Sequence, residues 1–180
     1  MKKILNDLSL TAKDLTRFLV IFIAIWIINH TLLMVVKVPT GSMKPTIKPP
    51  AIVLSTRYDI NKIERYDVVV FDSPNKDHVK YIKRVIGLPG ETIVVKNGKA
   101  YLLKDTGQEV FLDKAYLPDE DFFSNGDGVF KVPSGCYFMM GDNRNHSNDA
   151  RFWETHYIKH KNIYAKGKYV LFPGFRRLCQ

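Results

Sequence analysis

The sequence predicts a mainly β domain of short antiparallel strands, preceded by one N-terminal transmembrane helix. Three observations lead to this prediction. The chain of 180 residues has a single long apolar run, close to its start. After that run, short β-branched and aromatic stretches alternate with Gly, Pro and Asn-Gly turn signals, a pattern typical of sandwiches and barrels. No segments of helical periodicity alternate with these stretches, which argues against a parallel α/β sheet.

The apolar run covers residues 18–36 and follows a polar head over residues 1–17. At about 1.5 Å per residue, the run would form a helix of roughly 28 Å, close to the hydrocarbon thickness of a bilayer. A buried core helix fits poorly with a run that is this long and apolar on every side. No A-x-A site follows that would mark a cleavable signal peptide. We therefore predict an uncleaved anchor over 18–36 and a folded domain over 37–180.

The charges beside this run leave its orientation open. Four Lys or Arg residues precede it, and four follow within about 20 residues, so the positive-inside rule gives a tie.

Beyond residue 50 the β-prone runs are short and are bounded by turn residues. Strands are expected at 52–54, 67–72, 79–86, 92–95, 100–103, 137–140 and 164–172. Asn97-Gly98 between two of these runs predicts a hairpin. Residues 104–131 are polar and glycine-containing, and we predict a loop-rich excursion there.

Composition excludes several classes of function. The formal net charge is +9, from 27 Lys and Arg against 18 Asp and Glu, but the basic residues are scattered and no nucleic-acid-binding signature occurs. Attraction to an anionic membrane surface explains this charge, so no nucleic-acid partner is expected. Cys136 and Cys179 lie far apart without metal-ligand spacing, and His156 and His160 lack a third ligand. We therefore expect no metal and no cofactor.

Directly after the apolar run, the stretch 38–46 presents a serine on a stiff turn. Gly41 permits a tight turn, and Pro39 and Pro45 fix their own φ and favour extended geometry before them. Ser42 is therefore exposed for chemistry, although Ser and Thr among Gly and Pro also form ordinary turns.

Lys83 is the second candidate for a catalytic residue. In the strand 79–86, a period of two places Lys83 on one face with Val79, Tyr81 and Val85. Burial there would lower the pKa of the amine, as a general base near neutral pH requires. The alternative is a lysine whose stem lies on apolar surface while its head reaches water.

A third segment, 139–153, follows a strand with a dense series of polar side chains. It ends in Phe152-Trp153, so it is expected to be anchored in the core, and Asp149 with Arg151 are expected to fix its conformation. A solvated loop is the alternative interpretation.

These three segments together resemble the signatures of bacterial type I signal peptidases, in the order of that family and behind a membrane anchor. The resemblance rests on 39–46, on Tyr81 to Glu91, and on Gly141 to Arg144 with Ser147-x-Asp149-x-Arg151. It extends over about residues 18–172 and implies a signal-peptidase-like β domain.

The resemblance implies a Ser–Lys dyad, with Ser42 as nucleophile and neutral Lys83 as general base. The Ser42 N–H and the Thr40 hydroxyl would form the oxyanion hole, and Ser147 would hydrogen-bond to the lysine and orient it. Gly141 would permit close packing beneath the dyad, and Asp149 with Arg151 would form a structural pair. The residues that match the pockets for small substrate side chains are Val38, Met43, Ile47, Tyr81 and Ile82.

The implied function is removal of signal peptides from exported preproteins with small residues at −1 and −3. The implied location is the bacterial cytoplasmic (inner) membrane, crossed once, with the catalytic domain on the extracytoplasmic side, in contact with lipid and near the export machinery. Two alternatives remain: a specialised protease of the same superfamily that matures a pilin during conjugation, and a non-catalytic, membrane-tethered β-barrel binding module.

Overall fold

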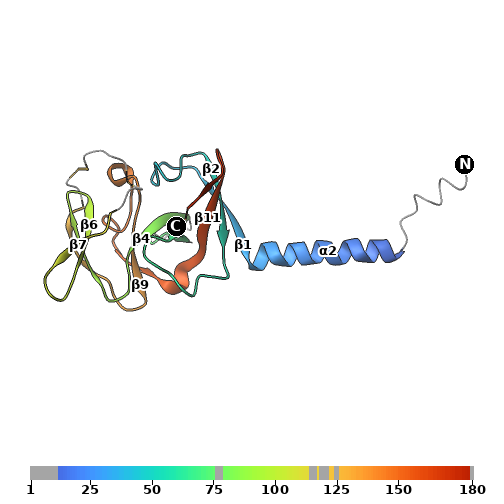
Figure 1. The fold of residues 1–180 in the computed structure, drawn as a ribbon, viewed down its shortest axis with the longest axis horizontal. Coiled ribbons are helices and arrows are strands. Elements are labelled where there is room, and N and C mark those ends of the chain that lie inside the picture. Colours follow the sequence, from blue (N-terminus) through green and yellow to red (C-terminus); the bar gives the residue numbers. More distant parts are fainter. Residues whose placement is uncertain (1–11, 76–78, 114–116, 118–121, 124–125, 179–180) are drawn as a thin grey trace, which may run out of the picture.

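A computed structural model of the chain describes residues 12–75, 79–113, 117, 122–123 and 126–178. One helix, α2 (Ala12–Thr31), projects from a domain made of strands and loops (Figure 1). The strands are β1 (Leu33–Val38), β2 (Ala51–Thr56), β3 (Val68–Asp72), β4 (Lys80–Gly87), β5 (Thr92–Lys96), β6 (Lys99–Leu103), β7 (Glu109–Phe111), β8 (Gly128–Lys131), β9 (Cys136–Met140), β10 (Ile158–Lys159), β11 (Ile163–Phe172) and β12 (Arg176–Arg177). Two short 3₁₀ turns are η1 (Arg144–His146) and η2 (His160–Asn162).

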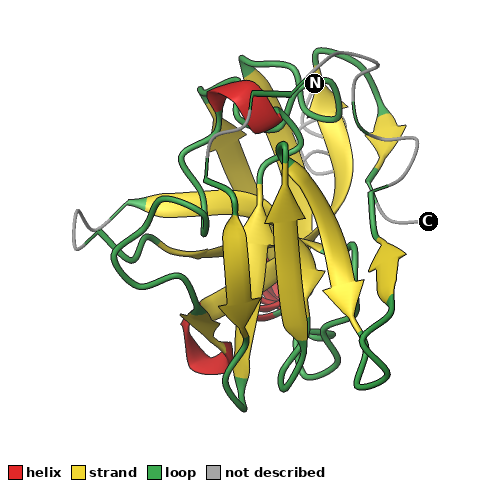
Figure 2. Ribbon diagram, turned by 90° about the vertical axis from the view of Figure 1, so that its left-hand side faces the viewer, coloured by secondary structure: helices red, strands yellow, loops and turns green. Residues whose placement is uncertain are grey.

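The strands form two antiparallel sheets. The larger sheet has the order β1-β2-β11-β3-β4-β9-β10, with β12 added beside β11, and the smaller has the order β7-β6-β5-β8. The smaller sheet lies at the end of the domain farthest from α2 (Figure 1). Figure 2 views the domain from that end and shows strands joined by loops with little helix. The predicted mainly β, antiparallel fold is confirmed.

The predicted hairpin is formed by β5 and β6. Asn97 and Gly98 both have positive φ, 50° and 70°, as a two-residue turn of type I′ requires. The predicted excursion over 104–131 contributes β7 and β8, which pair with β6 and β5. Within it, residues 114–116, 118–121 and 124–125 lie outside the described residues.

Strand β3 is buried on both faces, which explains its unbroken β-branched sequence. Val69 and Phe71 belong to one hydrophobic cluster, shared with β4, β5, β8 and β9. Val68 and Val70 belong to a second, shared with β1, β2 and β11. Each fully buried apolar side chain contributes about 1.5–3 kcal/mol. Strand β4, which pairs with β3 along five residue pairs, is therefore held in a rigid setting.

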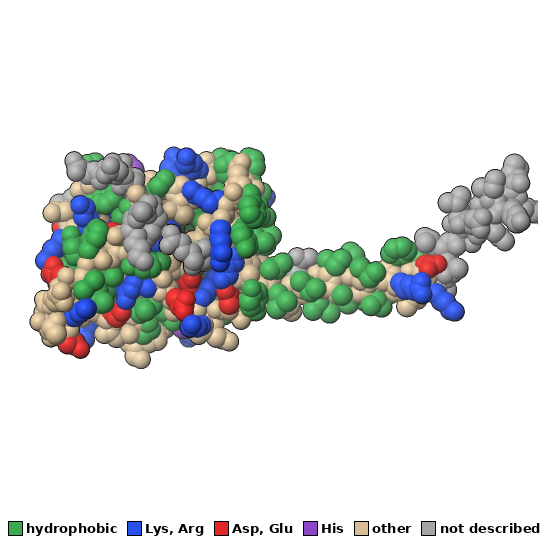
Figure 3. All heavy atoms as spheres, viewed as in Figure 1, with side chains coloured by type: hydrophobic (Ala, Val, Ile, Leu, Met, Phe, Trp, Pro, Cys, Tyr) green, Lys and Arg blue, Asp and Glu red, His purple; other side chains and the backbone are tan. Residues whose placement is uncertain are grey.

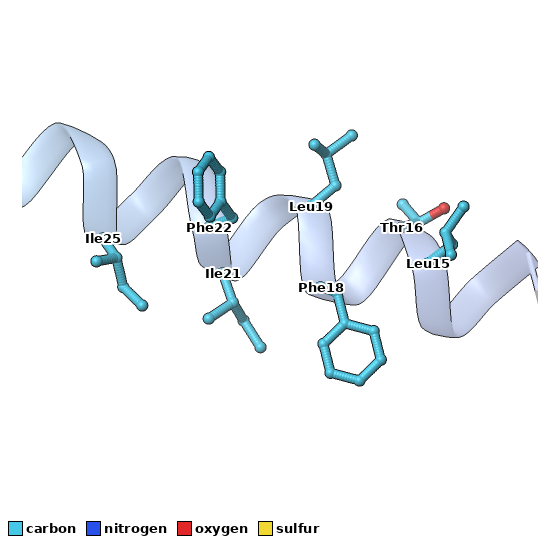
Figure 4. A pocket seen from close by; sticks show the side chains of 7 residues that line it. All are labelled: Leu15, Thr16, Phe18, Leu19, Ile21, Phe22 and Ile25. Atoms are coloured by element: carbon cyan, nitrogen blue, oxygen red, sulfur yellow. The ribbon is translucent and has the colours of Figure 1, made fainter. Parts of the chain in front are cut away.

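Helix α2 leads directly into the domain. Its apolar side chains are exposed, and Figure 3 shows them along the length of the helix. In Figure 4, Leu19 and Phe22 leave the ribbon on the side opposite Phe18 and Ile21, so the apolar surface is not confined to one stripe. Among the described residues, no helix combines the length and the apolarity needed to cross a membrane.

The predicted span of 18–36 is wrong at its C-terminal end. The helix ends at Thr31, and Leu33–Val38 form strand β1, which pairs with β2 over six residue pairs. The apolar residues 33–36 are therefore part of the sheet. Hydropathy alone does not separate them from the helix because a half-buried strand and a lipid-facing helix both favour Leu, Met and Val.

Candidate functional site

Three segments far apart in the sequence meet at one place. The turn after β1 carries Ser42, the middle of β4 carries Lys83, and the segment after β9 packs behind them. Lys83 Nζ donates a hydrogen bond to Ser42 Oγ at 2.6 Å, and both residues are buried, with 5% and 8% of their surface exposed. The two residues predicted as nucleophile and base are thus brought into contact. The prediction that Ser42 is exposed is wrong, because its turn packs against β4 and the segment after β9.

The surroundings of Lys83 are largely apolar. Its partner in the sheet register is Val69, and the amine lies 5.6 Å from the centre of the Tyr81 ring. Tyr81 in turn packs against Phe71 and Trp153, with ring centroids 6.3 Å and 6.1 Å away. The predicted anchoring of the third segment is therefore provided by Trp153, which is buried, whereas Phe152 is exposed.

Burial lowers the pKa of Lys83 from its ordinary value of 10.5 to about 8. Removal from water disfavours the ammonium form and is the main cause. The carboxylates of Asp149 and Asp142 oppose the shift, and the guanidinium of Arg151 adds to it. At pH 7 about a tenth of the amine is then neutral, against less than a thousandth for an unperturbed lysine.

The turn that carries Ser42 is fixed by hydrogen bonds. Within it, Lys44 N–H donates to the Gly41 carbonyl at 3.1 Å and Ile47 N–H donates to the Met43 carbonyl at 2.7 Å. The Thr40 and Ser42 hydroxyls lie 3.5 Å apart. Thr40, predicted for the oxyanion hole, is thus adjacent to the nucleophile.

Gly141 lies directly against the dyad. A Cβ atom at this position would lie 2.1 Å from Ser147 Oγ and 2.5 Å from the Ser42 carbonyl oxygen, so only glycine fits. Ser147 is buried, but its hydroxyl has no hydrogen-bond partner among the described residues. The predicted hydrogen bond from Ser147 to Lys83 is therefore not formed in this structure. The hydroxyl instead packs against the Gly141 backbone.

Asp149 and Arg151 form the predicted pair. Arg151 Nε donates to Asp149 Oδ1 at 2.8 Å, and a second guanidinium nitrogen donates to Oδ2 at 3.0 Å. Asp149 Oδ2 also accepts from the Gly141 N–H at 2.9 Å, and Arg151 donates to the Arg144 carbonyl at 2.8 Å. This pair therefore fixes both ends of the segment behind the dyad.

Two further buried ion pairs were not foreseen from the sequence. Arg84, next to Lys83, makes two hydrogen bonds to Asp142 at 2.8 Å and 2.6 Å. Arg144 pairs with Asp113 in a similar two-pronged manner. Arg84, Asp142 and Arg144 lie within the segments that resemble the signal peptidase signatures, whereas Asp113 lies outside them. Each pair joins positions far apart in the sequence, so neither motif nor spacing reveals the pairing.

A cleft of about 550 Å³ opens above Ser42 and Lys83. Its other lining residues are Val36, Lys37, Val38, Pro39, Thr40, Gly41, Val79, Lys80, Tyr81, Ile82, His146 and Asn148. Three predicted pocket residues, Val38, Tyr81 and Ile82, are among them. Met43 and Ile47 are not: both are fully buried, in the core cluster that also contains Val38 and Ile82. Their role in this structure is to support the cleft wall.

Comparison with known proteins identifies the family. The sequence model of the family described as "Signal peptidase, peptidase S26" matches residues 12–172. The chain therefore belongs to the S26 family of signal peptidases, as its three motifs predicted.

Similar proteins include signal peptidase I of Pseudomonas fluorescens, 31% identical over 76% of this chain and 61% of that protein. Signal peptidase I of Rickettsia canadensis is 29% identical over 93% of this chain and 82% of that protein. The chain thus spans about three fifths of the length of the Pseudomonas relative. A crystal structure of a signal peptidase I from Enterococcus faecalis V583 matches with 27% identity and a TM-score of 0.46, covering 58% of this chain and 96% of that one.

The contacts of Gly141 lead to a prediction. Gly141→Ala should lower turnover by about 100-fold because the added methyl group displaces Ser147 and the Ser42 backbone, and small displacements at a reacting centre have effects of this order. Turnover should be measured together with the melting temperature. Gly174→Ala is the matched control, since its added methyl group meets no atom within 4 Å. Full turnover of Gly141→Ala would contradict the close packing beneath the dyad.

Proposed function

We propose that this chain is a membrane-anchored serine endopeptidase that removes N-terminal signal peptides from exported preproteins. The observation that carries the proposal is the buried contact of 2.6 Å between Lys83 Nζ and Ser42 Oγ at the floor of an open cleft. A lysine with a lowered pKa in contact with a serine hydroxyl is the arrangement that activates a weak nucleophile.

In the first half of the proposed reaction, the amine of Lys83 is neutral and accepts the proton of the Ser42 hydroxyl. Ser42 Oγ attacks the scissile carbonyl carbon, and the negative charge that develops on the carbonyl oxygen is stabilised by the Ser42 N–H and the Thr40 hydroxyl. As the tetrahedral intermediate collapses, Lys83 returns the proton to the leaving amine. The mature protein departs, and the signal peptide remains as an ester on Ser42.

In the second half, a water molecule attacks this ester and Lys83 accepts its proton. The oxyanion forms again in the same place, and its collapse returns the proton to Ser42 Oγ and releases the signal peptide. One base thus serves both halves, which requires its pKa to lie near the working pH. The value of about 8 for Lys83 satisfies this requirement.

The proposed substrate is an extended segment with small side chains at −1 and −3. Val38, Tyr81 and Ile82 line the cleft, and such short apolar walls favour small apolar side chains. Strand β1 ends the order of the larger sheet in the described residues and contributes Val36–Val38 to the cleft. An extended peptide can therefore hydrogen-bond along this strand, as in β-augmentation, while alternate side chains enter the cleft.

We further propose that α2 anchors the chain in the bacterial cytoplasmic membrane, with the N-terminal end of the helix inside and the catalytic domain, which begins with β1, on the extracytoplasmic side. The exposed apolar side chains along α2 support contact with lipid, because water-exposed apolar surface of this extent is unfavourable. The family relationship supports the orientation. Anchoring would place the site beside export machinery and raise the effective concentration of substrate.

The dyad is tested by cleavage of a detergent-solubilised preprotein that carries an A-x-A site. Wild type should cut after this site, and Ser42→Ala and Lys83→Ala should each lose at least about 10³-fold in rate because the nucleophile and its base act as a unit. Lys131→Ala, which removes an exposed lysine of β8, is the matched control and should retain full rate. Circular dichroism should show that all variants are folded.

Two results of this experiment would overturn the assignment. Full activity of Lys83→Ala would mean that another group, such as a histidine, is the base. A folded wild-type enzyme that cuts no A-x-A preprotein would favour the specialised protease or the non-catalytic binding module.

The membrane anchor is tested on the full chain expressed in bacteria. The chain should stay in the membrane pellet after alkaline carbonate extraction, and protease added outside spheroplasts should digest the catalytic domain. Replacing Ile21 and Ile25 with lysine should weaken retention, since each buried charge disfavours insertion. Release of the wild-type chain by carbonate would contradict the anchor, and protection from outside protease would contradict the orientation.

A further inference from the structure

Asn143, to which the motifs assign no role, makes two contacts with the turn that carries Ser42. Its side-chain amide Nδ2 donates to the Gly41 carbonyl at 3.0 Å, across 102 positions of sequence. Its backbone N–H donates to the Ser42 carbonyl, also at 3.0 Å. The carbonyls on both sides of the nucleophile are therefore bonded to one residue.

The position of Asn143 in the chain makes the side-chain contact unusual. Asn143 is the N-cap residue of the 3₁₀ turn η1, and an asparagine at such a position commonly accepts a hydrogen bond from the N–H groups of its own turn. Here the side chain makes no capping hydrogen bond. It extends to Gly41 instead, so the local preference is overridden by a contact with the catalytic turn.

The neighbours of Asn143 hold it in place. On one side Asp142 is fixed by Arg84 of β4, and on the other Arg144 is fixed by Asp113. All four of these side chains are buried, with 1–5% of the side-chain surface exposed. A residue held at both flanks by buried ion pairs presents its side chain in a defined direction, as a positioning residue requires.

The hydrogen bond from Asn143 to the Gly41 carbonyl affects the Ser42 N–H, the group that would stabilise the transition state. The Gly41 carbonyl and the Ser42 N–H belong to the same peptide unit, which is planar and trans, so the two groups point in opposite directions. Fixing the carbonyl on the Asn143 side therefore fixes the N–H on the other side. Within the described residues, this N–H has no hydrogen-bond partner, so it is available to a substrate oxygen.

We infer that Asn143 is a positioning residue for the oxyanion hole, aligning the Ser42 N–H through its hydrogen bond to the Gly41 carbonyl. This inference rests on the proposed peptidase function. Loss of an entire oxyanion-hole donor lowers turnover by about 10²–10³-fold. The Lys44 N–H also donates to the Gly41 carbonyl, so loss of the Asn143 amide should misalign the peptide rather than free it. A decrease of about tenfold is expected.

The test uses one substitution at two positions of the same segment. Asn143→Asp keeps the size of the side chain but removes the NH₂ donor. In Asn145→Asp, the matched control, the contact to the Phe123 N–H is made by Oδ1, and a carboxylate retains that acceptor. Both variants add one negative charge. Turnover of an A-x-A peptide by the full chain should be measured on the high-pH plateau, where Lys83 is neutral in all variants.

Two ligands separate a role in the transition state from a role in the fold. A peptide aldehyde with the A-x-A sequence forms a tetrahedral adduct with Ser42 and needs the oxyanion hole, whereas the corresponding peptide alcohol does not. For Asn143→Asp, we expect kcat and the affinity for the aldehyde to fall about tenfold. KM, the affinity for the alcohol and the melting temperature should stay at the wild-type values. Asn145→Asp should match the wild type in all five measurements.

The outcomes are distinguishable. Equal kcat and aldehyde affinity for Asn143→Asp and Asn145→Asp would overturn the inference while leaving the peptidase function intact. Equal losses for the aldehyde and the alcohol, together with a lower melting temperature, would assign Asn143 a purely structural role and also overturn it. Failure of the wild type to cleave the peptide would overturn the proposed function and the inference that rests on it.

Discussion

The site depends on keeping the amine of Lys83 away from water while it touches Ser42. An ammonium ion is strongly hydrated, so its burial is unfavourable unless the proton is lost, and this lowers the pKa to about 8. The rest of the domain makes that burial possible. Strand β3 supplies Val69 opposite Lys83, and the Tyr81 ring lies beside the amine and is itself packed by Phe71 and Trp153, so the lysine is held within a rigid sheet.

The charged side chains behind the dyad contribute to the geometry of the site. Three buried Arg–Asp pairs fix the segment from Gly141 to Arg151. Buried ion pairs lose much of their attraction to desolvation, so they are weak evidence for stability. In this domain their clearest consequence is geometric: they hold Gly141 and Asn143 against the turn that carries Ser42. Arg151 also offsets part of the effect of Asp149 and Asp142, and removal from water outweighs the remainder, so the pKa of Lys83 stays lowered.

The sequence predicted the strands, because β-branched runs and turn residues leave local signals, whereas the local signals of the dyad residues left ordinary alternatives open. Lys83 lies between apolar neighbours at a period of two, and Ser42 lies in a turn of fixed dihedral angles. The family resemblance then brought the two together. The end of the helix could not be predicted, because residues 33–36 are as apolar as the segment before them. The contacts of Asn143, Arg84 and Asp113 could not be predicted either, since each joins distant positions and depends on how the sheets curve. Met43 and Ile47 illustrate a further limit: they match pocket positions by motif, but the turn directs them into the core.

The central claim, that Lys83 is a buried amine with a pKa far below that of an ordinary lysine, can be measured directly. Lysine labelled with ¹³C at Cε would be incorporated into the chain, and the Lys83 signal would be assigned by its absence from Lys83→Met. The chemical shift would then be followed from pH 6 to pH 12 by NMR. We predict a titration midpoint near 8 for Lys83. A midpoint near 10.5, the ordinary value, would show that the amine is solvated and would contradict its assignment as a neutral base.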